Sequence, residues 1–141
     1  MMLRPRQVVI CAALAGVYWI LATLCIRLDP GGIAPGLRGD LSFATSVFAS
    51  WFCVWLVCRL AKLEPHQILA GAMVVLGDAM LIDGAALRWF PTVYGVDDHL
   101  ARTGAAWLLW GYGISAWIAF MIAERRLRSG KAGSELSLAT I

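Results

Sequence analysis

Two aspartates stand inside an otherwise apolar stretch of the chain and are the residues best placed to do chemistry. Asp78 and Asp83 lie in the run LGDAMLIDGAAL, which contains no Lys, Arg or His. A charged aspartate at the middle of a bilayer costs about 2.5–3.5 kcal/mol on insertion scales, so it is retained where it faces a polar partner, water or a bundle interior. We interpret Asp78 as a candidate site for handling a proton or cation. For both aspartates the alternative is a hydrogen-bonded tie between helices.

The spacing of the two aspartates separates them on a helix. Five positions correspond to about 140° of rotation and about 7.5 Å of rise, so Asp78 and Asp83 do not chelate one ion as a simple pair. Asp83 is expected to reach Arg88, Arg102 or water. Asp78 needs hydroxyl or indole partners from elsewhere in the chain. The candidates are Ser46, Ser50, Trp110, Tyr112 and Ser115.

Long apolar tracts position these residues. A spanning helix needs about 20 mainly apolar residues to cross about 30 Å of hydrocarbon, and four tracts satisfy this, at about 8–26, 41–59, 68–87 and 103–123. They are too long for barrel strands and show no alternation. We predict an all-α polytopic membrane protein, a four-helix transmembrane bundle in up-down-up-down order with sequential helices as antiparallel neighbours. The bundle occupies residues 1–128, and the polar tail at 129–141 is expected to be loosely ordered.

Composition supports a bilayer as the solvent. The 141 residues suffice for one domain, and 60% of them are hydrophobic while 15% are charged, more apolar surface than a small soluble globule can bury. Basic residues flank the tracts and form no stripe with interleaved aromatics, so we expect no nucleic-acid partner. The four cysteines lie inside apolar tracts without a Cys-x-x-Cys pair and are predicted to be small buried residues. We expect no metal and no cofactor.

The distribution of Lys and Arg predicts the orientation. The side that holds the N-terminus, the turn near residue 62 and the tail carries twice as many basic residues as the opposite side, which predicts that both termini are cytoplasmic. A cleaved signal peptide is disfavoured, because the first tract is long for a signal core and Leu24 spoils a lipoprotein cleavage site. The first group is Arg4, Arg6, Arg59, Lys62, Arg125, Arg126, Arg128 and Lys131; the second is Arg27, Arg38, Arg88 and Arg102.

Small residues at regular spacing predict how the helices pack. Small side chains let transmembrane helices approach closely. They recur at seven-residue intervals in the third tract and at four-residue intervals in the fourth. The predicted packing residues are Ala70, Gly77 and Gly84, and Gly111, Ser115 and Ala119. Trp89, Tyr94 and Trp107 flank the connection between these tracts and are predicted to anchor it at headgroup depth.

The second half of the chain resembles an uncharacterised bacterial family. The resemblance covers residues 78–112 and rests on Asp83-Gly84, Phe90-Pro91, Tyr94-Gly95 and the run AWLLWGY at 106–112. Members are small four-span proteins known only as a domain of unknown function. The resemblance implies a four-helix fold in a bacterial inner membrane. It does not imply any activity.

Three functional hypotheses remain open. The first is proton- or cation-linked transport at the intramembrane aspartate, with a homo-oligomer forming the pathway. The second is a non-catalytic accessory or assembly subunit that docks on a larger membrane complex through its small residues. The third is a lipid- or quinone-related enzyme, and it is the weakest, because the sequence shows no paired catalytic residues, metal-ligand spacing or nucleophile with a base.

Overall fold

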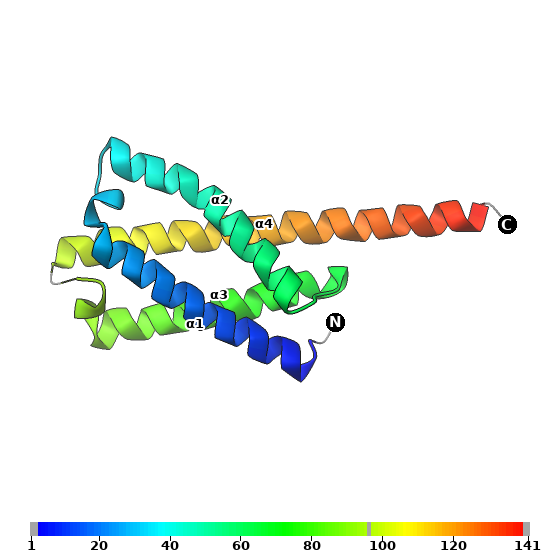
Figure 1. The fold of residues 1–141 in the computed structure, drawn as a ribbon, viewed down its shortest axis with the longest axis horizontal. Helices are drawn as coiled ribbons and strands as arrows, with labels where there is room; N and C mark the ends of the chain where they lie inside the picture. Colours follow the sequence, from blue (N-terminus) through cyan, green and yellow to red (C-terminus); the bar gives the residue numbers. More distant parts are fainter. Residues whose placement is uncertain (1–2, 96, 140–141) are drawn as a thin grey trace.

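The computed structural model describes residues 3–95 and 97–139, which fold into four long helices that alternate in direction (Figure 1). All four are long and apolar enough to cross a membrane, and the described residues contain no strand. The predicted all-α, four-helix, up-down-up-down membrane bundle is confirmed. The helices are α1 (Pro5–Leu28), α2 (Leu37–Leu60), α3 (Ile68–Trp89) and α4 (Asp98–Ala139), with the 3-10 turns η1 (Pro30–Gly32), η2 (Pro65–Gln67) and η3 (Pro91–Val93).

The two ends of the bundle differ in what they hold. The α1–α2 and α3–α4 connections lie together at one end, which we call the Tyr94 end. The N-terminal start of α1 and the α2–α3 connection lie at the other, the Gln67 end. Each connection contains a 3-10 turn that begins with proline, whose fixed φ and missing N–H end a preceding helix.

The closest helix pair is α1 with α3, which run parallel to each other. Small residues recur every four positions on both buried faces: Cys11 and Ala15 on α1, and Gly71, Val75 and Ala79 on α3. Such faces allow close backbone approach. Helix α4 packs on α2 and α3, whereas α1 and α2 scarcely touch. Sequential helices are therefore not all close neighbours, since the connection at residues 29–36 is long enough to let α1 and α2 diverge.

The contact face of α3 is rotated from the predicted seven-residue seam. Ala70 is half-buried, and an added Cβ at Gly77 or Gly84 would meet no atom within 4 Å. Gly111 on α4 is equally open, whereas Ala119 is fully buried at 0% exposure. Within the described chain, Gly77, Gly84 and Gly111 therefore support no close helix contact.

Helix α4 extends well beyond the bundle (Figure 1). Its 42 residues correspond to about 63 Å at the usual helical rise, twice the depth of the hydrocarbon core. The helix passes through 129–139, where the sequence predicted a loosely ordered tail. No proline follows Pro91, and the Glu124–Arg128 pair, at 3.2 Å, supports the helix at i and i+4 as it leaves the bundle.

Candidate functional site

A buried polar cluster surrounds Asp83, which is buried at 5% exposure on the inward face of α3. The hydroxyl of Tyr94 donates to Oδ1 of Asp83, and the hydroxyl of Tyr112 donates to Oδ2. Trp19 Nε1 of α1 donates to the Tyr94 oxygen at 3.1 Å. We call these four residues the Asp83 cluster. It joins α1, α3, α4 and the α3–α4 connection around one carboxylate.

Local backbone geometry brings Tyr94 into this cluster. Helix α3 ends before Pro91, and η3 turns the chain back toward the bundle. The next residue after Tyr94 is Gly95, whose φ of +154° is rarely adopted by residues with a side chain. Tyr94 is then buried at 1% exposure in an apolar cluster with Ile26 and Leu108. The predicted headgroup anchor is therefore a core residue.

The environment of Tyr94 changes its acidity. Burial and the hydrogen bond to Asp83 raise the pKa of the Tyr94 hydroxyl above its ordinary value. Removing the proton would place a second negative charge beside the carboxylate in a site with little water. Tyr94 is thereby fixed as a neutral hydrogen-bond donor.

No cation neutralises the Asp83 carboxylate among the described residues. Arg88 and Arg102, the predicted partners, are exposed, and neither forms an ion pair in the described chain. Two neutral hydroxyls therefore provide its direct support. A carboxylate has about four acceptor positions, so two remain available to a proton, a cation or another donor. A buried charge of this kind is costly unless it is paired.

Asp78 has a different environment from Asp83. It is half-buried and makes no hydrogen bond or ion pair with any residue that the structure describes. The stronger candidate site is therefore Asp83, where the sequence had favoured Asp78.

The predicted partners of Asp78 are used elsewhere. Tyr112 bonds to Asp83. Trp110 Nε1 donates to the carbonyl of Phe43 at 3.1 Å, and Ser46 Oγ donates to the same carbonyl at 2.7 Å. The remaining two candidates, Ser50 and Ser115, line a cavity.

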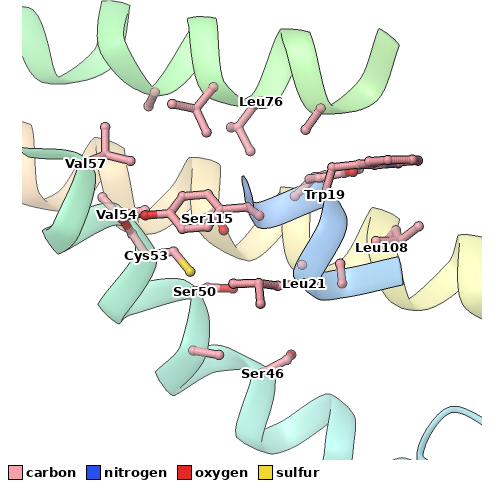
Figure 2. A pocket seen from close by; sticks show the side chains of 18 of the residues that line it. Trp19, Leu21, Ser46, Ser50, Cys53, Val54, Val57, Leu76, Leu108 and Ser115 are labelled. Carbon is pink, nitrogen blue, oxygen red and sulfur yellow. Dashed lines mark hydrogen bonds between the residues drawn. The ribbon is translucent and has the colours of Figure 1, made fainter. Parts of the chain in front are cut away.

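That cavity occupies about 260 Å³ between the four helices (Figure 2). Its wall is mostly apolar, and Ser46 and Ser50 of α2 and Ser115 of α4 all line it. Trp19 and Tyr112 belong both to this wall and to the Asp83 cluster. The buried carboxylate is thus one side chain removed from a cavity that all four helices build.

Sequence reasoning missed the roles of Trp19 and Tyr94. Trp19 is one of seven tryptophans, and its spacing does not distinguish a hydrogen-bonded indole from a lipid-facing one. Tyr94 carried one usable signal, since the Gly95 that follows it marks a turn that can reverse the chain toward the bundle. Comparison of the chain with protein-family models, curated proteins and solved structures found no match.

Proposed function

We propose that this chain handles a proton or a cation at Asp83 and links it to the transport of a second molecule. The observation that supports this proposal is a buried carboxylate held by neutral donors beside a cavity. A buried acid without a cationic partner gains most from binding a proton or cation. Asp83 takes the role that the sequence had suggested for Asp78.

The hydrogen bonds of the Asp83 cluster suggest how the two events are linked. While Asp83 is ionised, it accepts from both Tyr94 and Tyr112. Once protonated, its hydroxyl must donate, and one tyrosine must turn its own hydrogen elsewhere. Tyr94 is held by Trp19 and the apolar core, whereas Tyr112 faces the cavity. Tyr112 is therefore the residue that releases Asp83 and offers its hydroxyl to a cavity-bound molecule.

The proposed setting is a bacterial inner membrane with both termini in the cytoplasm. Eight basic residues near the Gln67 end against four near the Tyr94 end support this orientation. The Asp83 cluster then lies toward the outer face. The bacterial inner membrane is proposed because the second half of the chain resembles the uncharacterised bacterial four-span family.

The experiment compares Asp83→Asn with Asp78→Asn, the same change on one helix. Each protein is reconstituted into liposomes loaded with a pH-sensitive dye, and proton entry is driven by a potassium diffusion potential. Asp83→Asn should lower the flux by about tenfold or more, whereas Asp78→Asn should keep most of it. A folded Asp83→Asn protein with wild-type flux would contradict the proposal. Circular dichroism and size-exclusion chromatography establish that both variants are folded.

A second candidate function is an accessory subunit of a larger membrane complex. It is favoured by Gly77 and Gly84 on α3, where an added Cβ would meet no atom of the described chain within 4 Å, because small residues with free space beside them suit close packing of another helix. Extraction in mild detergent should then recover a stable foreign partner with wild type and lose it with Gly77→Leu. A partner-free homo-oligomer in both samples would favour transport instead. Gly113→Leu on α4, at another open glycine, is the control.

A further inference from the structure

We propose that the cavity binds a neutral, lipid-soluble molecule that carries a carbonyl-type hydrogen-bond acceptor and enters from the bilayer between α1 and α2. The inference rests on the proposed function, because it names the class of molecule that would be transported. It is carried by the chemistry of the cavity wall, by a serine hydroxyl without a partner and by the position of the opening.

The wall excludes a charged ligand. None of the described side chains that line it is Asp, Glu, Lys, Arg or His, so an ion inside would have no opposite charge from them in direct contact. Its polar atoms come from three serines, from Tyr18 and Tyr112, and from the indoles of Trp19 and Trp107. Apolar walls with a few polar groups are typical of sites for small uncharged molecules.

One hydroxyl of the wall is left without a hydrogen-bond partner. Ser50 is buried at 7% exposure, faces the cavity in Figure 2 and makes no hydrogen bond with a described residue. A serine hydroxyl can donate, and leaving a buried donor unpaired is unfavourable. A ligand with a carbonyl oxygen would satisfy this hydroxyl.

The opening faces the side of the bundle. Leu21 and Cys25 of α1 and Ala49 of α2 line the cavity and are also exposed, at the place where α1 and α2 scarcely touch. Toward the Gln67 end the gap is crossed by the Tyr18 hydroxyl, which donates to the Cys53 carbonyl at 3.1 Å. Because both helices are long and apolar enough to span the membrane, this opening faces lipid tails and gives lateral entry.

The size of the cavity indicates how much of the ligand it encloses. About 260 Å³ lies just below the range of about 300–1,000 Å³ typical of ligand pockets. It accommodates a compact polar head and the first part of a chain. A longer hydrocarbon tail would leave through the lateral opening and remain in the bilayer.

The test uses photo-crosslinking in lipid nanodiscs with the methyl ester of a diazirine-bearing fatty acid. Labelling should appear on peptides that contain residues 18–25 and 46–58, as read by mass spectrometry. Gly111→Leu fills the cavity and should lower this labelling at least fivefold. Gly113→Leu is the matched control, because Gly113 has open space and does not belong to the wall. Equal labelling in wild type and Gly111→Leu would overturn the proposal.

Competitors identify the head group. Decylubiquinone that displaces the probe indicates a quinone-type carbonyl, whereas displacement by methyl decanoate alone indicates an ester-type lipid. Decyltrimethylammonium should not compete, and stronger competition by this cation than by both neutral molecules would overturn the neutral assignment.

Flux separates the two proposals. If Gly111→Leu keeps both the proton flux and the labelling of wild type, the cavity inference is overturned and the role of Asp83 stays intact. Specific labelling of a wild-type protein that moves no protons supports the cavity and contradicts the proposed function.

Discussion

The bundle carries a buried polar cluster at each end, and the two clusters are built from different chemistry. At the Gln67 end, the side chains of Gln7 and Gln67 are both buried. The Gln7 amide nitrogen lies 3.0 Å from the Gln67 oxygen, 3.2 Å from the Ala61 carbonyl and 3.3 Å from the Lys62 carbonyl. The Gln67 cluster, as we name this group, is neutral and ties α1 to the α2–α3 connection.

The Asp83 cluster at the Tyr94 end differs in charge and in balance. Its donors, from Trp19, Tyr94 and Tyr112, all lead toward one carboxylate, and no cation among the residues that the structure describes completes it. In the Gln67 cluster, by contrast, amide oxygens also accept from the chain, at 2.8 Å from the Arg4 nitrogen and 3.2 Å from the Glu64 nitrogen. The hydrogen bonds of the Gln67 cluster join amide and backbone groups, which do not titrate, whereas a carboxylate held only by donors depends on its protonation and occupancy.

The largest expected effect removes the neutral cluster. Gln7→Leu leaves the Ala61 and Lys62 carbonyls and the Gln67 amide without this buried partner, which should cost about 3 kcal/mol of the free energy of unfolding. Proton flux per folded molecule should not change, because the Asp83 cluster lies at the opposite end. The measurement is unfolding in mixed micelles as the fraction of denaturing detergent rises. Arg6→Gln, at an exposed neighbour, is the control. If Gln7→Leu lost flux but kept its stability, the Gln67 cluster would have the functional role and not the structural one.

The next effect concerns the turn that delivers Tyr94. Gly95→Ala places a side chain at φ +154°, where its Cβ would lie 2.5 Å from the Leu100 side chain. Strain of this kind costs about 1–3 kcal/mol, and the displaced Tyr94 would no longer support Asp83. We expect lower stability and lower flux together. Gly16→Ala, at an open helical glycine, should change neither property. Unchanged flux in Gly95→Ala would show that Tyr94 is not needed by the carboxylate.

The next prediction concerns flux and separates the two tyrosines of the Asp83 cluster. Tyr112→Phe removes one donor to the carboxylate, and a hydrogen bond to a charged group is worth about 1.5–3 kcal/mol. Because the proposed linkage needs this hydroxyl to hold and release Asp83, proton flux should fall several-fold in the variant. The change is measured in the same liposomes as for Asp83→Asn. Trp110→Phe, which removes the bond to Phe43, is the control; equal flux in all three proteins would remove Tyr112 from the proposed linkage.

The same comparison shows what could be predicted from the sequence. Hydrophobic length and proline positions predict four helices, because backbone groups in a bilayer must be satisfied within a helix. The two intramembrane aspartates could be identified from the sequence because a charged side chain in a bilayer is costly. Tyr112 was among the predicted partners, but of Asp78, and Trp19 and Tyr94 were not predicted as partners. The reason is that these three residues meet Asp83 from three separate segments. The rotation of α3 about its axis decides whether Asp78 or Asp83 is buried in the bundle. That rotation depends on packing against α1, where small residues at four-residue spacing compete with the predicted seven-residue seam.

The smallest effect is a loss of stability at alkaline pH that results from ionisation of Tyr94. The Gln67 cluster cannot produce this loss. The pKa of Tyr94 in the folded protein is raised above its ordinary value of 10.0 by burial and by the bond to Asp83. The unfolded chain therefore loses this proton first, so the contribution to stability is complete below pH 10 and declines above it. The loss amounts to about 0.8 kcal/mol at pH 10.5 for one such group.

Tyr94→Phe tests this loss, since it removes the ionisable group and keeps the ring in its apolar site. The free energy of unfolding of the variant should fall less steeply between pH 9.5 and pH 10.5 than that of wild type. Gln7→Leu should retain the wild-type slope despite its lower stability. Equal slopes in wild type and Tyr94→Phe would mean that the Tyr94 hydroxyl loses its proton as readily in the folded protein as in water. The Asp83 cluster would then be open to solvent and lose the buried character that separates it from the Gln67 cluster.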